Sequence, residues 1–238
     1  MSVYVSKRQK AIRKIDAEKK TLPLKEAIQL LKTGPASKFD QSIAIQVKLG
    51  VDPAAPDQAV RGTTFLPHGQ GKKLRVIVFT KDEVGKAARE TGADEVGGDD
   101  LIEKVMKGWM DFDVVIATPS IMKEVGKLGK TLGPRGLMPS PKAGTVTDNP
   151  AKAVKEVKSG RVEFKMDKFA NVNTVIGKLS FAENVLVDNG SALINSLVKA
   201  KPKTMKGVYI KSAHLSSTMG CGVRLDLTSF LREKESEE

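Results

Sequence analysis

The stretch TLGPRGLMPSPKAGTV at residues 131–146 contains three glycines, three prolines and no acidic residue. Proline removes a backbone donor and glycine loses extra backbone entropy on ordering, so the stretch predicts a long loop with neither regular helix nor central strand. Loops of this length inside a compact chain are usually functional or disordered. Lys130, Arg135 and Lys142 would project from this loop, which favours a phosphate-rich partner.

The sequence on both sides of this loop alternates short apolar runs with helical patterns. Before the loop, strands are expected at residues 74–79, 93–96 and 113–117, and helices at 84–91, 101–110 (capped by Asp99 or Asp100) and 121–128 (capped by Ser120). After the loop, Asn149 and Pro150 begin a helix that Gly160 ends. Such alternation predicts a parallel sheet, here a three-layer, Rossmann-like α/β domain at residues 68–159.

The two flanking parts of the chain have a different, α+β pattern. Helices are expected at residues 7–20, 24–31 (capped by Thr21) and 181–198, and strands at 43–49, 62–66, 161–165, 172–176, 208–214 and 223–227. Neither flank is large enough for a generous core of its own. We therefore expect residues 1–67 and 160–238 to form one discontinuous α+β domain, with the α/β domain inserted between them.

The composition is strongly basic, with 40 Lys and Arg against 28 Asp and Glu, a formal net charge of +12. This excess points to nucleic acid or another anionic surface as the partner, the alternative being a protein that is merely basic. One cysteine, Cys221, excludes an intrachain disulfide and fits a reducing compartment. We expect no zinc and no cofactor, no signal peptide or membrane span, and a cytoplasmic location.

The alternative of a nucleotide-binding enzyme of the α/β class depends on Gly129-Lys130-Thr131, which resembles the end of a P-loop. That motif needs a glycine five residues before the Gly-Lys pair, where this chain has Glu124, and it needs a preceding strand. His68 stands alone, and no Cys–His pair or HExxH motif accompanies it. We therefore expect a protein without enzymatic activity.

Two basic clusters and two small motifs are candidates for RNA contact. The first cluster includes Lys7 and Arg8, with Lys10, Arg13 and Lys14 following, and the second is Lys165 with Lys168. The motifs are KFD at residues 38–40, with Ser42 close behind, and SSTMG at residues 216–220, which includes Ser217. Their hydroxyl and backbone groups suit phosphates and riboses, while Phe39 and Met219 could pack on a sugar or base. The alternative places both side chains in the core. Since aromatic residues are only 5% of the chain, folded RNA is favoured over a single strand.

Seven segments carry a resemblance to a known family. They are KFD (38–40), LPHGQGK (66–72), GGDDLIEKV (97–105), GWMDFDVVIATP (108–119), KLGKTLGPRGLMPSPKAGTVT (127–147), GRVEFKMDK (160–168) and STMG (217–220). In this order they resemble the L-one family of large-ribosomal-subunit proteins, which lie on the mobile rRNA stalk. The glycine–proline segment is the most specific of them, and together the segments span nearly the whole chain.

The resemblance implies a structural constituent of the large ribosomal subunit, monomeric when free, whose split domain binds a folded site in 23S rRNA. By matching motif, the rRNA-contact role falls on Lys38, Phe39, Ser42, Ser212, Thr218, Met219 and Gly220. Lys130, Arg135 and Lys142 would face further stalk RNA or the tRNA leaving the exit site. The family also implies repression of translation through the protein's own mRNA. One departure is Cys221-Gly222, where the family usually has proline and serine.

Overall fold

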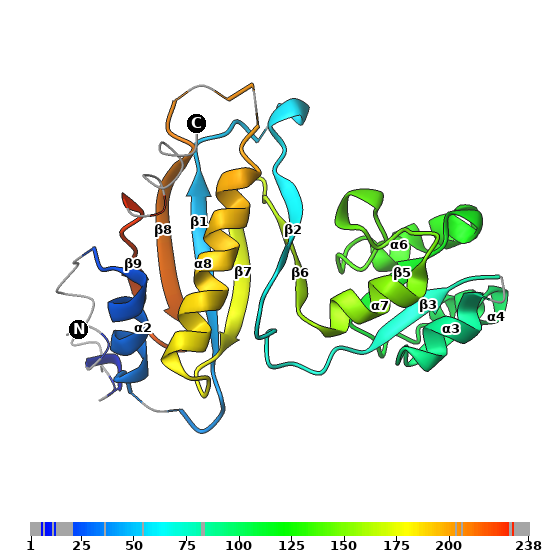
Figure 1. Cartoon of the computed structure of the whole chain (residues 1–238), viewed down its shortest axis with the longest axis horizontal. Coiled ribbons are helices and arrows are strands. Elements are labelled where there is room, and N and C mark those ends of the chain that lie inside the picture. Colours follow the sequence, from blue (N-terminus) through cyan, green and yellow to red (C-terminus); the bar gives the residue numbers. More distant parts are fainter. Residues whose placement is uncertain are drawn as a thin grey trace, which may run out of the picture. The chain divides into compact units, whose positions relative to one another are not determined.

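The chain divides into two compact units of mixed α/β structure (Figure 1). Unit 1 comprises Met1–Gly71 and Glu163–Glu238, and unit 2 comprises Lys72–Val162. A computed structural model describes residues 6, 8–10, 12, 21–35, 37–53, 55–81, 84–202, 204–205, 207–228 and 230. The basic helix expected at residues 7–20 therefore lies largely outside the described residues.

Unit 1 is built on a four-stranded antiparallel sheet with strand order β7-β1-β8-β9. The strands are β1 (Ser42–Leu49), β7 (Asn171–Lys178), β8 (Ile210–Ser217) and β9 (Gly222–Arg224). Figure 1 shows β1, from the first part of the chain, lying between β7 and β8 from the last part. The central strand and its partners thus come from opposite ends of the sequence.

The core of unit 1 lies between this sheet and two helices, α2 (Leu24–Lys32) and α8 (Glu183–Lys199). Alternate residues of β1 are buried in it: Ile43, Ile45, Val47 and Leu49. Gly190 in α8 allows close packing, because a Cβ there would lie 3.0 Å from a methyl group of Leu24. The expected Thr21 cap is wrong, since Pro23 occupies the N-cap position of α2 and makes no side-chain capping bond.

A two-stranded sheet and a tethered connection complete unit 1. The sheet pairs β2 (Arg61–Phe65) with β6 (Arg161–Lys165), of which residues 163–165 belong to unit 1, and a 3-10 helix, η1 (Pro56–Gln58), precedes β2. After β2, the buried amide of Asn189 accepts a hydrogen bond from the His68 backbone N–H at 3.2 Å. The same side chain donates to the carbonyls of Gly69 at 2.9 Å and Ile176 at 2.8 Å. Asn189 therefore ties the connection to both α8 and β7.

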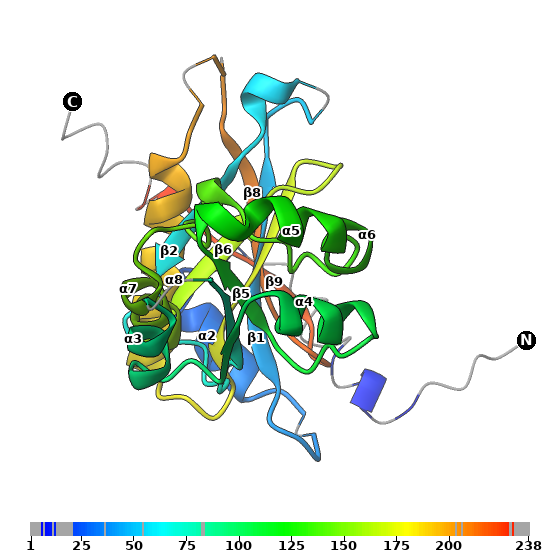
Figure 2. The same cartoon turned by 90° about the vertical axis from the view of Figure 1, so that its right-hand side faces the viewer.

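Unit 2 is a parallel sheet with helices on both faces. Its strands have the order β4-β3-β5, with β3 (Val76–Phe79), β4 (Glu95–Gly97) and β5 (Val114–Ala117). One face packs against α3 (Val84–Glu90) and α7 (Pro150–Lys158), and the other against α4 (Asp99–Met106), α5 (Met122–Val125) and α6 (Gly129–Leu132). Figure 2 shows these two groups of helices on opposite sides of the strands.

The ends of the unit 2 helices differ in part from expectation. Gly98, and neither Asp99 nor Asp100, is the N-cap of α4, whose first turn holds both acids. The helix expected at residues 121–128 is a series of short turns, in which η2 (Pro119–Ile121) and η3 (Gly126–Leu128) flank α5. The cap at Asn149 is confirmed, because its side chain accepts from the Lys152 backbone N–H at 3.3 Å.

The glycine–proline stretch is ordered and packed onto unit 2. Its first residues end α6, where Leu132 is fully buried, and a 3-10 turn, η4 (Pro141–Ala143), follows. Val146 then forms a parallel bridge with Ala117 at the edge of the sheet. Hydrogen bonds such as that from the Leu137 N–H to the Leu132 carbonyl at 3.1 Å, and buried side chains such as Leu132 and Ala143, thus hold a segment that the composition predicts only as a loop.

Among the described residues, no helix has the length and apolar character that a bilayer crossing requires. The described His, Cys, Asp and Glu side chains likewise form no cluster of three suited to a metal ion.

Candidate nucleic-acid interface

The two small motifs of unit 1, distant in sequence, meet at one end of the sheet. The backbone N–H of Thr218 donates to the carbonyl of Ser42 at 3.0 Å. The Thr218 hydroxyl accepts from the Ser42 backbone N–H at 3.1 Å and donates to the Ser42 carbonyl at 3.3 Å. This contact joins the first residue of β1 to the turn between β8 and β9.

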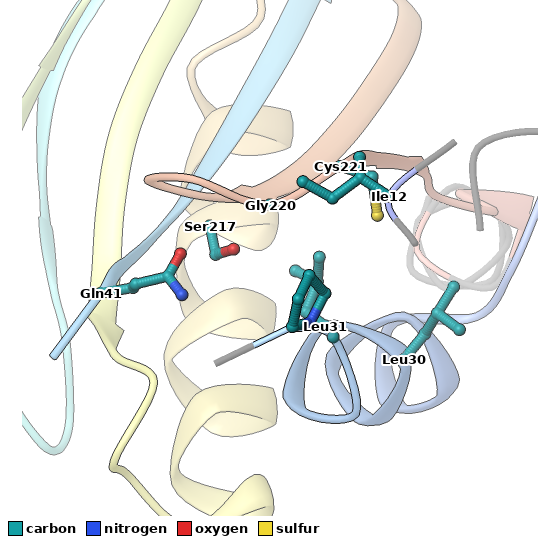
Figure 3. A pocket seen from close by; sticks show the side chains of 9 residues that line it. Ile12, Leu30, Leu31, Gln41, Ser217, Gly220 and Cys221 are labelled. Atoms are coloured by element: carbon teal, nitrogen blue, oxygen red, sulfur yellow. The ribbon is translucent and has the colours of Figure 1, made fainter. Parts of the chain in front are cut away.

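Hydrogen bonds to buried polar groups fix the backbone of the turn at residues 218–220. The side chain of Gln41, only 3% exposed, accepts from the Met219 backbone N–H at 3.0 Å. Gly220 donates to the Ser217 carbonyl at 3.1 Å and approaches so closely that a Cβ would lie 2.2 Å from Ser217 Oγ. Figure 3 shows Gln41, Ser217 and Gly220 beside a small cavity that Leu31 also lines.

Phe39 and Met219 are surface residues, so the core interpretation of both is wrong. The Phe39 side chain is 52% exposed and that of Met219 is 50% exposed. Their backbones are nonetheless fixed, since Ser37 Oγ donates to the Phe39 carbonyl at 2.5 Å and Gln41 holds Met219. Two apolar side chains are thus presented to solvent on an ordered backbone, an arrangement suited to packing against a sugar or base.

Cations surround this end of the sheet. Lys38 is exposed, and Arg8 Nη2 donates to the Met219 carbonyl at 3.2 Å. Lys178, at the end of β7, donates to Ser42 Oγ at 2.9 Å and was not singled out from the sequence. Lys7 lies outside the described residues. We call the set Arg8, Lys38, Phe39, Ser42, Lys178 and residues 217–220 the turn cluster.

The remaining candidates of unit 1 lie at the opposite end of β1. Ser212 is opposite Lys48, five residues along the strand from the Ile43–Ser217 pair, which is about 17 Å at the usual rise per residue. Lys168 lies in the turn that leads into β7, and Lys165 is the last residue of β6. The predicted site residues therefore form two groups, which composition and spacing did not separate.

A polar strip on the sheet connects the two groups. On the face of β1 turned away from α2 and α8, Gln46 is partly exposed and donates to Ser216 Oγ at 2.9 Å. His214 in β8 and Asn173 in β7 lie opposite Gln46 in the neighbouring strands. These residues were not predicted as RNA contacts from the sequence, although the alternation of buried and polar residues in β1 was a signal for them.

Unit 2 carries its own candidate residues on α6 and the turn after it. Lys130 and Arg135 are exposed, whereas the side chain of Lys142 lies outside the described residues. Gly129 begins α6, and η3 and α5 precede it, so the strand that a P-loop requires before its glycine-rich turn is replaced by helical turns.

The ion pairs distinguish cations that a carboxylate of the protein neutralises from exposed cations that can contact an anionic ligand. Many cations of unit 2 face a carboxylate, as in Lys72–Asp113 at 2.6 Å and Arg161–Glu156 at 2.5 Å. Hydrogen bonding to Lys72 is the main cause that lowers the pKa of the Asp113 carboxyl. In contrast, no described acid pairs with the exposed cations among the candidates: Lys38, Lys130, Arg135, Lys165 and Lys168.

Comparison with known proteins gives a consistent assignment. Residues 30–221 match the profile of the Ribosomal protein L1p/L10e family. The chain is 51% identical to the large ribosomal subunit protein uL1 of Protochlamydia amoebophila, over 97% of this chain and 98% of that protein. It is 52% identical to the uL1 protein of Beutenbergia cavernae over 91% of both chains, and 51% identical to that of Streptomyces avermitilis over 93% of both. The chain therefore belongs to the Ribosomal protein L1p/L10e family.

Proposed function

We propose that this protein is a structural constituent of the large ribosomal subunit that binds 23S rRNA at the mobile stalk. Family membership over most of the chain and near full-length relatives named as large-subunit proteins support this proposal. In it, the two compact units act as separate domains. Unit 1 makes the main rRNA contact, and unit 2 makes an auxiliary one.

The turn cluster is the observation that carries the proposal. It combines two half-exposed apolar side chains, Phe39 and Met219, with hydroxyls and with cations that no described carboxylate neutralises. Cations supply affinity for phosphates, whereas a fixed turn with apolar and hydroxyl groups supplies fit to a ribose or base. Such a surface suits RNA that is recognised by shape and by its 2′-hydroxyl groups.

The second group, with Lys165, Lys168 and Ser212, extends the proposed surface by about 17 Å along β1. A strand of a nucleic-acid duplex carries one phosphate about every 3.4 Å along the helix axis, so a surface of this length spans several nucleotides. The polar strip at Gln46 between the two groups supplies neutral donors and acceptors for ribose hydroxyls.

Binding to a stalk-region 23S rRNA fragment, compared with an unrelated hairpin across a salt series, tests this function. We expect selective binding whose logarithm falls linearly with that of the salt concentration. Phe39→Ala and Met219→Ala should each weaken binding about tenfold without changing the melting temperature. Matched controls are Phe65→Ala and Met106→Ala, because their side chains are 53% and 52% exposed elsewhere on the protein. Equally weak binding to both RNAs would mean that the positive charge of the protein attracts RNA without selectivity.

The finer roles concern the exit-site tRNA and the protein's own mRNA. We assign a tRNA-facing or stalk-facing role to Lys130, Arg135 and Lys142, supported by the exposure of Lys130 and Arg135, with which no described carboxylate forms an ion pair. A K130A/R135A/K142A variant should retain binding to the stalk fragment and slow the release of deacylated tRNA from ribosomes. An unchanged rate of tRNA release would contradict the tRNA-facing role of these three residues.

Repression of the protein's own mRNA would use the turn cluster itself, because one surface cannot hold two RNAs together. A leader fragment of that mRNA should compete with the stalk fragment, and Phe39→Ala should weaken both complexes by the same factor. Simultaneous binding of the two RNAs would contradict this assignment.

A further inference from the structure

Phe169 has the most exposed large hydrophobic side chain in the described part of the chain, at 73%. It lies in the turn at residues 167–170 that joins β6 to β7, in the second group of candidate residues. A single exposed apolar side chain is common on protein surfaces and by itself indicates nothing. The construction of the turn and the charges around it make Phe169 different.

The backbone on both sides of Phe169 is tied down. The Asp167 carboxylate accepts from the backbone N–H groups of Phe169 and Asn171, both at 2.8 Å, and from the Asn171 side chain at 3.2 Å. The Lys48 ammonium donates to the Phe169 carbonyl. The ring is therefore carried on an ordered turn, and a ligand that packs on it has little backbone entropy to remove.

The next residue, Ala170, shows that this conformation is imposed by the surrounding structure. Ala170 has a φ of 58° and is 3% exposed, and it is the one described non-glycine residue with positive φ. A side chain in the left-handed region costs about 1–2 kcal/mol, and such strain persists where the rest of the fold requires it, often at functional sites. Ala170 belongs to the core of unit 1, and its N–H donates to the Asp167 carbonyl at 3.2 Å while its carbonyl accepts from the Leu49 N–H at 2.8 Å, so the fold fixes the turn next to the exposed Phe169.

The electrostatic surroundings of Phe169 favour an anionic partner. Lys168 and Lys165 are exposed, and no described carboxylate pairs with them. The nearest acid, Asp167, is occupied by N–H donors, and these hydrogen bonds, that of the Asn171 backbone first, lower the pKa of its carboxyl. An apolar ring among unpaired lysines fits a ligand that offers both a flat face and neighbouring phosphates.

We propose that Phe169 stacks on an unpaired base of the bound RNA, while Lys168 and Lys165 contact the phosphates beside that base. The inference rests on the proposed RNA-binding function and assigns a second specific contact to it, at the opposite end of β1 from the turn cluster. A base-stacking residue here would favour RNAs that have a bulged or looped nucleotide at this distance from the Phe39 contact.

The test compares full-length variants in binding to the stalk-region fragment. Phe169→Ala should weaken binding about tenfold, and Phe169→Leu, which keeps apolar bulk without an aromatic face, should recover little of the loss. Both should leave the salt dependence unchanged, whereas Lys168→Ala should reduce its slope by about one phosphate. Phe65→Ala, with a 53% exposed ring on β2, is the matched control and should bind like the unaltered protein.

A fluorescence measurement reports stacking directly. Trp109 is the single tryptophan of the chain, so a W109F/F169W protein has one indole, at the proposed contact. Its emission should be quenched by the stalk fragment and should remain unchanged with a fragment that lacks unpaired nucleotides.

The possible outcomes distinguish the stacking role of Phe169 from the RNA-binding function itself. Wild-type affinity for Phe169→Ala together with weakened binding for Lys168→Ala would overturn the stacking role and leave RNA binding intact. Full recovery by Phe169→Leu would also overturn it, since apolar packing would then be sufficient. If the unaltered protein did not distinguish the stalk fragment from an unrelated hairpin, the proposed function itself would fail.

Discussion

The hydroxyl of Thr218 forms hydrogen bonds with both backbone polar groups of Ser42, the first residue of β1. It accepts a hydrogen bond from the Ser42 N–H at 3.1 Å and donates one to the Ser42 carbonyl at 3.3 Å. Ser42 and Thr218 are far apart in the sequence, and this pair connects the two motifs of the turn cluster. The Thr218 side chain therefore adds two hydrogen bonds to the backbone bond that already joins the two motifs, from the Thr218 N–H to the Ser42 carbonyl at 3.0 Å.

Thr218→Val should destabilise unit 1 by about 1 kcal/mol, because valine keeps the shape of threonine and removes both hydroxyl hydrogen bonds. Urea denaturation measures this change in the free energy of unfolding. Thr218→Ser, which keeps the hydroxyl, is the control and should lose less. An unchanged Thr218→Val together with a destabilised Thr218→Ser would show that the methyl group, and not the hydroxyl, is what matters.

Gly220→Ala should distort the turn cluster, since the added Cβ would lie 2.2 Å from Ser217 Oγ. We expect a loss of about 1–3 kcal/mol in the free energy of unfolding and weaker RNA binding. Gly222→Ala is the matched control two residues away, because a Cβ there meets no atom within 4 Å. The double variant S217A/G220A removes the clashing oxygen and should recover stability; if it does not, the steric explanation is incorrect.

Asn189→Ala should destabilise unit 1 by about 2–3 kcal/mol, because three backbone groups lose the partner that replaces water. These groups are the N–H of His68 and the carbonyls of Gly69 and Ile176. Asn195→Ala, on an exposed position of the same helix, is the control and should change stability by less than about 0.5 kcal/mol. Similar losses at the two positions would contradict the tethering role of Asn189.

Tyr209→Phe should stabilise the protein by about 1 kcal/mol at neutral pH, because the buried Tyr209 hydroxyl has no hydrogen-bond partner among the described residues. Burial also raises the pKa of Tyr209 from 10.0 to about 12. Above pH 10 the unfolded chain therefore ionises while the folded phenol does not, so stability falls as the pH rises from 10 towards 12.

The Tyr209→Phe variant lacks this ionisation, so its advantage should widen over that range. Denaturation at a series of alkaline pH values, with Tyr4→Phe in both proteins, checks the difference. A constant difference between pH 8 and 12 would mean that the phenol ionises freely in the folded state.

Local features of the fold were predictable, because they depend on neighbouring residues. The alternation from Ile43 to Leu49 predicts β1 to within one residue, and the Asn149–Pro150 pair predicts the beginning of α7. The caps expected at Thr21, Asp99 and Asp100 were wrong, since acceptor side chains near a helix start also occur one or more residues away from the cap. The partners of β1 were not predictable, because strand pairing joins distant segments.

The candidate site was predicted as residue types rather than as an arrangement. The glycine, hydroxyl and apolar residues of STMG left Met219 open as an RNA contact or a core residue, and its 50% exposure excludes the core. Gln41 and Lys178 escaped notice because a lone glutamine or lysine gives no pattern, and their roles arise from Met219 and Ser42. Sheet register placed Ser212 apart from Thr218, and composition contains no information about register.

The position of β1 between β7 and β8 has a consequence for the order of events during synthesis. Roughly 170 residues must be added after β1 before β8 is complete, which takes roughly 8 to 34 s at about 5–20 residues per second. During that interval β1 has no β8 to pair with and the Ser42–Thr218 contact cannot form. A growing chain thus emerges without the turn that is proposed to contact RNA, and acquires it only when translation of β8 and β9 ends.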